Sequence, residues 1–239
     1  MWIDSERFLV SNRGVLQEPT FVRNLFSSIA TRYDLANHLL SGGLDFFWRR
    51  RAARIVRGWK PSRILDLATG SGDVALTLKK QIPAATIIGA DFCHPMLLQA
   101  QAKGVENLVT ADGMQLPFDE GAFDALTIAF GLRNMASWPG ALREMARVLK
   151  PGGHLLILDF SIPRAPLRGP YRFYLHRILP RIASMLTHEK TAYDYLGDSI
   201  EKFPHGAEMT RLIEENGFVN ATCEPLNCGI VSLYTARRV

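Results

Sequence analysis

The sequence predicts an α/β fold in which helices cover a mostly parallel sheet. Short apolar segments typical of strands alternate with helical segments through the middle of the chain, and a glycine-rich turn follows the first of these strands. Strands that alternate with helices in this way form right-handed βαβ units. The 239 residues, 47% of them hydrophobic, are enough for one large domain with its own core.

The N-terminal part of the chain is expected to form a helical arm or lid ahead of the sheet. Apolar residues recur at helical spacing over 19–40, and Gly42 and Gly43 interrupt that pattern. A second helix is expected from about Asp45, as its N-cap, to Arg57. The expected division is residues 1–58 for this arm and residues 59–239 for the sheet domain, with a helical insertion at about 163–204.

Five strands and three helices are expected in the first half of the sheet domain. The strands are 63–67, 85–90, 107–111, 123–130 and 154–160. The helices are 74–81, 96–103 and 138–149. A Lys-Pro-Gly-Gly run predicts a tight turn at 150–153.

The pattern changes after the last of these strands. Residues 163–185 are rich in arginine, proline and aromatic residues and predict an insertion with one helix. A helix is expected over 206–216, and two strands close in sequence, 218–226 and 229–236, are expected to pair as an antiparallel hairpin.

Composition favours a cytoplasmic protein in a reducing compartment. The three cysteines are sparse and include no CxxC pair, which argues against a disulfide framework and against a bound metal. The first ten residues do not resemble a signal peptide, and no apolar run approaches the roughly 20 residues of a membrane span.

The strongest chemical signal is the run Leu-Asp-Leu-Ala-Thr-Gly-Ser-Gly-Asp at 65–73, where a strand enters a glycine-rich turn and then a helix. Gly70 and Gly72 allow positive φ angles and a close approach of the backbone to a ligand. Free N–H groups at the start of the helix can donate hydrogen bonds to that ligand. Alone, such a loop is equally consistent with an ordinary tight turn.

Two carboxylates make this signal more specific. Asp91 ends the second expected strand, 19 residues after Gly72, where α/β nucleotide sites hold the ribose hydroxyls. Asp112 follows the third strand. All of these features lie at the carboxyl ends of strands, the edge at which open parallel sheets bind ligands.

The acidic residue inside the first strand separates two candidate cofactors. Dinucleotide sites usually carry GxGxxG with a pyrophosphate over the helix. Here Asp66 would repel a pyrophosphate, but it would suit the ammonium group of an amino acid. The loop therefore favours S-adenosylmethionine over NAD.

Three further segments carry a family resemblance. They are Phe-Gly-Leu-Arg-Asn at 130–134, Glu-Met-Ala-Arg-Val-Leu-Lys-Pro-Gly-Gly at 144–153, and Tyr33-Asp34-x-x-Asn37. With them the chain resembles the ubiquinone/menaquinone biosynthesis C-methyltransferase family from about Phe21 to Val231. Departures from the family pattern are Ser71 in place of threonine, Asp159 in place of glutamate, and a C-terminal segment without the usual His-x-Gly.

The resemblance implies a class I methyltransferase fold, a Rossmann-like three-layer sandwich whose seven-stranded sheet is mostly parallel with an antiparallel last strand. It implies cofactor contacts at Ser71, Asp91, Asp112 and Gly113. The complete set of expected cofactor-binding residues is Tyr33, Asp66, Gly70, Ser71, Gly72, Asp91, Met96, Asp112 and Gly113. For Tyr33, a packed core tyrosine is an equally good interpretation.

Members of that family methylate a ring carbon of a polyprenylated hydroquinone. The expected activity is S-adenosylmethionine-dependent C-methylation of a demethylated isoprenoid quinol, with demethylmenaquinol preferred to the ubiquinone precursor. Two alternatives stay open: methylation of another lipophilic small molecule, and a non-catalytic module that binds S-adenosylmethionine or RNA.

Arg133 and Asn134 are the first candidates for catalysis and for binding the acceptor. A guanidinium can stabilise a developing phenolate or orient a water, but it is too basic to be the proton acceptor. The alternatives are a structural ion pair for Arg133 and a turn contact for Asn134. Tyr171 and Tyr174 are expected to bind the acceptor, and His176 is a candidate base, with an ordinary surface histidine as its alternative.

Two segments have the composition of a surface that lies on an anionic membrane, and the chain carries a formal charge of +5. The first is Phe46-Phe47-Trp48 followed by three arginines at 49–51. The second interleaves Arg164, Arg168, Arg172, Arg177 and Arg181 with Leu167, Phe173, Leu175, Ile178 and Leu179. An amphipathic helix packed on the core would have the same pattern. The sequence contains no nucleic-acid recognition motif, so we do not expect these arginines to bind nucleic acid. A homodimer is a separate expectation.

Overall fold

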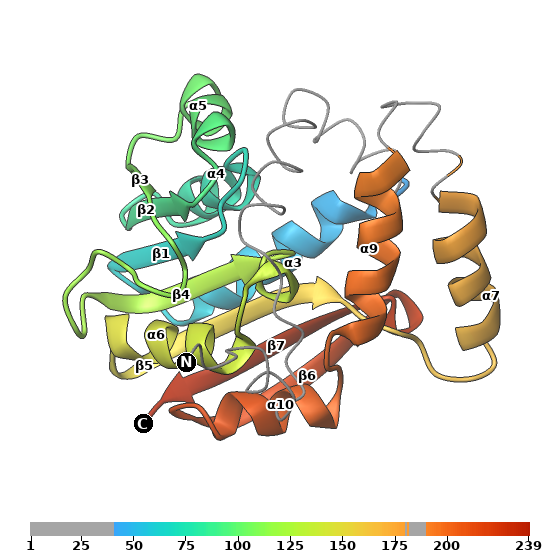
Figure 1. The fold of residues 1–239 in the computed structure, drawn as a ribbon. Helices are drawn as coiled ribbons and strands as arrows, with labels where there is room; N and C mark the ends of the chain where they lie inside the picture. Colours follow the sequence, from blue (N-terminus) through green and yellow to red (C-terminus); the bar gives the residue numbers. More distant parts are fainter. Residues whose placement is uncertain (1–40, 180, 182–189) are drawn as a thin grey trace, which may run out of the picture.

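The computed structural model describes residues 41–179, 181 and 190–239 (Figure 1). Its strands are β1 (Arg63–Leu67), β2 (Thr86–Asp91), β3 (Leu108–Thr110), β4 (Phe123–Ala129), β5 (Leu149–Phe160), β6 (Phe218–Leu226) and β7 (Val231–Arg238). Its α-helices are α3 (Leu44–Gly58), α4 (Asp73–Gln81), α5 (His94–Ala102), α6 (Trp138–Val148), α7 (Arg168–Phe173), α9 (Lys190–Lys202) and α10 (Ala207–Glu214). Short helical turns are η3 (Leu132–Asn134), η4 (Tyr174–Ile178) and η5 (Asn227–Gly229).

The seven strands form one sheet in the order β3-β2-β1-β4-β5-β7-β6. The strands β1 to β5 are parallel to one another, whereas β7 runs antiparallel to both β5 and β6. This confirms the predicted mostly parallel sheet with an antiparallel final hairpin. The expected strands and helices of the first half also occur, with ends shifted by at most two residues, except that β5 begins at Leu149 and not at His154.

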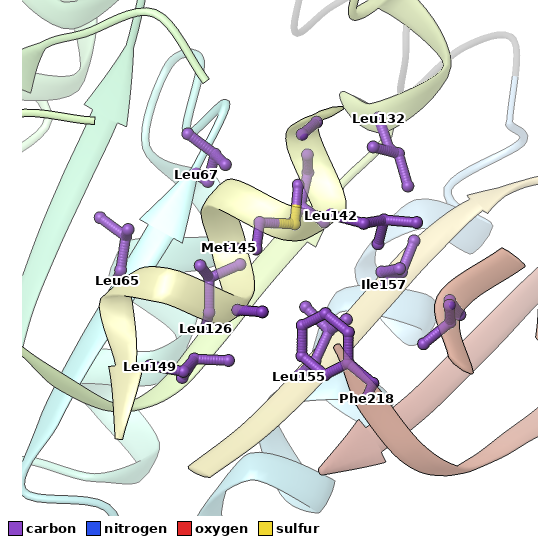
Figure 2. Close-up of a cluster of buried hydrophobic side chains, with 14 of the residues drawn as sticks. Leu65, Leu67, Leu126, Leu132, Leu142, Met145, Leu149, Leu155, Ile157 and Phe218 are labelled. Atoms are coloured by element: carbon purple, nitrogen blue, oxygen red, sulfur yellow. The ribbon is translucent and has the colours of Figure 1, made fainter. Parts of the chain in front are cut away.

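Helices cover both faces of the sheet and make three layers (Figure 1). Successive residues of a strand point to opposite faces, so Leu65 lies in the core under α6 and α10 while Ile64 lies in the core under α3 and α4. Both side chains are fully buried. Leu142 and Met145 of α6 lie against the first of these faces (Figure 2). A strand that is buried on both sides is mostly apolar, as β4 is apart from Asp124 near its start and the buried, hydrogen-bonded Thr127.

Two local predictions were wrong. Asp45 is not the N-cap of α3: Gly43 precedes the helix in a left-handed conformation, and Asp45 lies in the first turn, where its carboxylate pairs with Arg49 one turn later. The expected turn at 150–153 belongs to β5, because Leu149 already pairs with Phe123 and the chain bulges before His154 pairs with Ala125.

The helix expected within 163–185 occurs as α7 and η4, whereas α9 was not predicted from the sequence. Gly197 weakens the helical signal in the sequence of α9. In the structure that glycine lies against His176, so that an added Cβ would be 3.3 Å from the imidazole Cε1. Tertiary packing, with Ile200 against Leu175 and Leu179, therefore stabilises a helix that local propensity does not reveal.

The expected helix at 19–40, with Tyr33, lies outside the described residues, so the proposed arm over 1–58 stays a prediction. No helix in the described ranges is both long and apolar enough to cross a bilayer.

Candidate active site

A pocket opens at the carboxyl ends of β1, β2 and β4, the edge at which the sequence places the ligand. Its lining consists of Ala68, Gly70, Asp91, Phe92, Cys93, Met96, Ala129, Phe130, Gly131 and Asn134. One wall is therefore the glycine-rich turn with the end of β2, and the other is the loop after β4.

The two glycines of the first wall have different roles. Both have positive φ, +56° at Gly70 and +86° at Gly72, as predicted. Gly70 faces the pocket. An added Cβ at Gly72 would lie 2.6 Å from Val105 Cγ2, so this residue allows the turn to pack closely on the segment after α5 rather than on a ligand. Of the two glycines, Gly70 alone lines this pocket, and contact of either with a ligand stays a prediction.

Asp91 holds the glycine-rich turn from the end of β2. Its Oδ2 accepts a hydrogen bond from the Gly70 N–H and its Oδ1 accepts one from the Cys93 N–H, both at 2.8 Å. The side chain lines the pocket although the residue is only 6% exposed. Burial raises the pKa of Asp91 to about 6. Each carboxylate oxygen keeps a second lone pair, so Asp91 can also accept hydrogen bonds from ligand hydroxyls.

Asp66 lies behind the turn rather than in its mouth. Its Oδ2 accepts from Thr69 Oγ1 at 2.6 Å and its Oδ1 from Thr127 Oγ1 at 2.7 Å. Burial raises the pKa of Asp66 to about 6, and the residue is 1% exposed. In this arrangement Asp66 joins the turn to β4. Its contact with an ammonium group stays a prediction.

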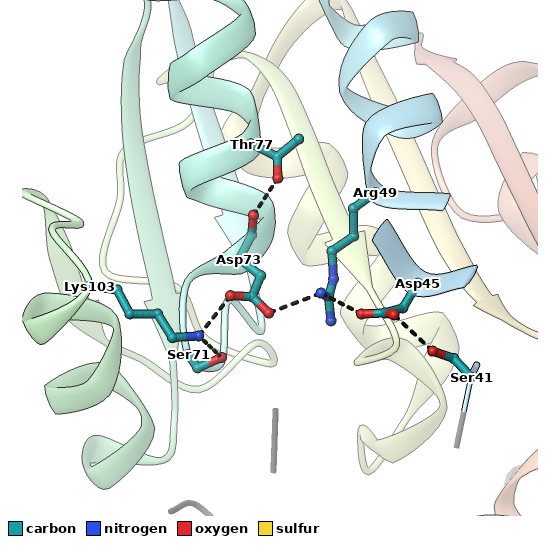
Figure 3. Close-up of polar contacts among 7 residues, drawn as sticks. All are labelled: Ser41, Asp45, Arg49, Ser71, Asp73, Thr77 and Lys103. Atoms are coloured by element: carbon teal, nitrogen blue, oxygen red, sulfur yellow. Dashed lines mark hydrogen bonds and ion pairs between the residues drawn. The ribbon is translucent and has the colours of Figure 1, made fainter. Parts of the chain in front are cut away.

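An ion network that the sequence analysis missed connects the turn to two helices (Figure 3). Asp73, in the first turn of α4, pairs with Lys103 at 2.7 Å and with Arg49 of α3 at 3.0 Å. Arg49 also pairs with Asp45, and Lys103 donates to Ser71 Oγ at 3.0 Å. The only sequence signal for this network was the four-residue spacing of Asp45 and Arg49.

Of the remaining predicted cofactor residues, Met96 lines the pocket, whereas Asp112 and Gly113 do not. Met96 is buried. Asp112 is exposed, and its Oδ1 accepts from the Met114 N–H. Gly113 packs under Met135, since an added Cβ would be 2.6 Å from Met135 Cε. Their contacts with a cofactor stay predictions.

Arg133 forms a buried ion pair in the second wall. Its Nη1 donates to Asp159 Oδ1 at 2.7 Å and to the Phe130 carbonyl at 2.5 Å, and the side chains of Arg133 and Asp159 are 5% and 0% exposed. The guanidinium lies over the ring of Phe160, 5.2 Å from its centre. Its Nε is buried and has no hydrogen-bond partner among the described residues. Burial raises the pKa of Asp159, and the positive charge of Arg133 opposes that shift.

Asn134 lines the pocket beside this pair. Its Nδ2 donates to the Phe130 carbonyl at 3.3 Å, and its Oδ1 accepts from the hydroxyl of Tyr195 at 3.1 Å. Phe130 itself has φ of +58°, which a non-glycine residue rarely adopts. A Cβ at Gly131 would overlap with the Cβ of Ala68, so only glycine fits at this position, where the two walls meet. Tyr195 was missed because α9 was not predicted.

The other acceptor candidates lie in the insertion. Tyr171 and Tyr174 stack with ring centres 6.5 Å apart and pack with Phe160 against one small apolar cluster. Burial raises the pKa of both phenols. His176 is exposed, and its Nε2 lies 3.2 Å from Glu201 Oε1 of α9. The structure therefore brings Phe160 and Arg133 together, while His176 is placed in a contact between η4 and α9.

Part of the expected membrane surface is internal. Trp48 is 2% exposed, and its Nε1 donates to Asn227 Oδ1 at 2.6 Å. Arg49 is buried in the network described above, and Arg51 pairs with Glu224. The interpretation of 46–51 as one aromatic and basic surface was wrong at Trp48 and Arg49, because the helix turns these two side chains towards the sheet and its neighbours. The partly exposed Arg51 does not contradict it.

The pocket thus offers the backbone at Gly70, the buried carboxylate of Asp91 and the amide of Asn134. The Arg133–Asp159 pair is buried next to Asn134 in the same loop and is not part of the pocket lining. Among the described residues, no three His, Cys, Asp or Glu side chains are grouped so that they could hold a metal ion.

The profile of the ubiE/COQ5 methyltransferase family matches residues 14–238. The chain belongs to this family. A demethylmenaquinone methyltransferase from Thermus thermophilus is 45% identical over 220 residues, which cover 90% of this chain and 100% of the relative. A protein from Syntrophotalea carbinolica named ubiquinone/menaquinone biosynthesis C-methyltransferase UbiE is 44% identical over 222 residues, 90% of this chain and 93% of the relative.

Solved structures agree on the fold. A SAM-dependent methyltransferase from Thermotoga maritima superposes with a TM-score of 0.65 at 18% identity, over 90% of this chain and 99% of its own. This confirms the class I methyltransferase fold that the sequence predicted. The methyl donor of this methyltransferase family is S-adenosylmethionine. The pocket lining fits this cofactor, because the backbone of Gly70 faces the pocket and Asp91 can still accept hydrogen bonds from the hydroxyls of a sugar.

We predict that binding of S-adenosylhomocysteine weakens as the pH falls through about 6, because protonation removes the charge of Asp91 at the pocket. Calorimetry should give about tenfold lower affinity at pH 5 than at pH 7.5. Asp91→Asn should bind weakly at both pH values. Asp66 titrates in the same range, and Asp66→Asn should keep the pH dependence of the wild type; if it loses that dependence instead, Asp66 is the group responsible.

We predict that Arg133→Ala lowers the free energy of unfolding by about 3 kcal/mol at pH 7.5, because Asp159 is left buried without its partner. The loss should shrink at pH 5.5. In the variant the folded-state pKa of Asp159 exceeds its unfolded value, so proton uptake favours the folded state as the pH falls. Urea unfolding measures both values.

The control is Lys150→Ala, which breaks a pair with Asp124 in which the lysine side chain is 53% exposed. It should cost less than about 1 kcal/mol. Equal losses in the two variants would contradict the buried-pair argument.

Proposed function

We propose that this protein is an S-adenosylmethionine-dependent C-methyltransferase whose acceptor is a demethylated isoprenoid quinol, demethylmenaquinol in particular. The observation that carries the proposal is the loop after β4 of this methyltransferase fold: its Asn134 lines the same pocket as the glycine-rich turn, and its Arg133 forms a buried pair with Asp159. Relatives named demethylmenaquinone methyltransferase, matched along nearly their whole length, support the choice of acceptor.

When bound, S-adenosylmethionine supplies a methyl group on a positively charged sulfur. The residues of this chain have the other tasks. A hydroquinone ring becomes nucleophilic at the carbon beside a hydroxyl when that hydroxyl loses its proton, so the site has to stabilise negative charge on the oxygen. Arg133 is suited to this, because its buried Nε–H has no hydrogen-bond partner among the described residues.

The partner of Arg133 limits what the guanidinium can do. Asp159 neutralises much of its charge and fixes its orientation over Phe160. This arrangement provides a directed donor rather than a mobile cation, which favours an oxygen at one defined position. Arginine is not a base at neutral pH, so the proton has to leave to water or to another group. We keep His176 as a proposal for that group, although its position against Glu201 favours a structural role.

The ubiquinone precursor is the second candidate acceptor, since other relatives carry names that include both quinones. It shares the hydroquinone ring, so the same residues would act on it.

The test is to incubate purified protein with methyl-labelled S-adenosylmethionine and a short-chain demethylmenaquinol kept reduced, with the demethylated ubiquinol precursor in parallel. We predict labelled menaquinol, with slower methylation of the second acceptor. Asp91→Ala is the negative control. The proposal fails if neither acceptor is methylated while S-adenosylhomocysteine still binds.

We also propose that the protein contacts an anionic bilayer through the start of α3 and through α7. Phe46, Phe47 and Phe173 are 59%, 56% and 61% exposed, which is unusual for phenylalanine in one domain. Arginines 164, 168 and 177 near α7 are exposed as well and would meet anionic headgroups.

Flotation with vesicles tests this second proposal. We predict that the protein binds vesicles containing phosphatidylglycerol better than pure phosphatidylcholine vesicles, and that Phe46→Ser with Phe47→Ser weakens binding severalfold. Leu98→Ser is the matched control, because Leu98 on α5 is 53% exposed on another helix. Equal losses in the two variants would show that the effect is not specific to α3.

A further inference from the structure

Tyr195 connects the insertion to the second wall of the pocket. It lies on α9, is half-buried, and donates its hydroxyl hydrogen bond to Asn134 Oδ1 across 61 positions of sequence, at 3.1 Å. Elsewhere α9 packs against η4 through Leu196 and Ile200. A hydrogen bond to a pocket residue is not needed for that packing.

The residue that Tyr195 contacts belongs to a short chain of hydrogen bonds. Asn134 donates to the carbonyl of Phe130, and the same carbonyl accepts from Arg133 Nη1. Phe130 has a positive φ, which costs free energy and persists only where neighbouring contacts hold it. Tyr195 therefore supports, through Asn134, the backbone that also orients Arg133.

The charges around the phenol are consistent with a donor role. Burial raises the pKa of Tyr195; Arg133 opposes this shift and Asp159 adds to it. The hydroxyl thus keeps its proton at neutral pH and lies in the field of the ion pair.

We propose that Tyr195 is a positioning residue for methyl transfer, which fixes Asn134 and the loop after β4 relative to the acceptor. This inference rests on the proposed function. It assigns the insertion a second task besides contact with the acceptor, because α9 then sets the geometry of the wall that carries Arg133.

The first test is Tyr195→Phe, which removes the hydroxyl and keeps the ring. We expect kcat/KM for the quinol to fall about tenfold, the effect of one lost hydrogen bond in a site. Affinity for S-adenosylhomocysteine should change less than about twofold, since the bonds of Asp91 to Gly70 and Cys93 do not involve Tyr195.

The matched control is Tyr234→Phe. Its hydroxyl accepts from the Gly206 N–H at 3.0 Å and is also hydrogen-bonded to Ser232 and Cys223, so this variant likewise loses tyrosine hydrogen bonds, in a residue that does not line the pocket. It should lower the unfolding temperature and leave kcat/KM unchanged. A fall in kcat/KM of the same size in both variants would overturn the inference.

A double-mutant cycle with Asn134→Ala shows whether Tyr195 acts through Asn134. If it does, the double variant is no slower than Asn134→Ala alone, whereas independent effects multiply and would overturn the inference. Should Asn134→Ala unfold, Asn134→Asp keeps an oxygen for the phenol, and Tyr195→Phe should again cost about tenfold in that background. Wild-type protein without turnover would reject the proposed function; normal turnover in Tyr195→Phe would reject only this inference.

Discussion

Two buried carboxylates hold the glycine-rich turn, and the rest of the site depends on them. Asp66 ties the turn to β4 from behind through two threonine hydroxyls, and Asp91 ties it to β2 from the pocket side through two backbone N–H groups. Burial raises the pKa of both groups to about 6, so the folded protein gives up some stability to keep them charged at neutral pH. Hydrogen bonds to every carboxylate oxygen reduce that cost.

The second wall also contains a buried carboxylate, but here a positively charged guanidinium pairs with it. Asp159 at the end of β5 is fully buried, and Arg133 compensates it at 2.7 Å. The pair orients the loop after β4, whose backbone at Phe130 is strained and whose Gly131 lies directly against Ala68 of the first wall. The distance between the two walls is therefore fixed by a contact that admits no side chain at Gly131, which suits a site that has to align a donor and an acceptor.

Elements outside the sheet are attached to the two walls separately. The helix α3 is joined to the glycine-rich turn through Arg49 and Asp73, and α9 is joined to the other wall through Tyr195 and Asn134. Each contact is polar and at least partly buried, so it is directional and sensitive to geometry. Methyl transfer between a charged donor and a lipid acceptor requires the two walls to keep a fixed position relative to each other. Through these contacts, that relative position depends on the helices that surround the site.

The sequence by itself determined where the strands and helices follow one another along the chain, the antiparallel final hairpin, the glycine-rich turn and the acidic residues at the strand ends. These features depend on local periodicity and on backbone conformation, which neighbouring residues specify. Only the tertiary structure decided which way polar side chains point. Asp66 faces Thr127, Trp48 reaches Asn227 and Tyr195 reaches Asn134, over 61, 179 and 61 positions of sequence. Such partners are set by the packing of whole elements against one another, which no short stretch of sequence specifies.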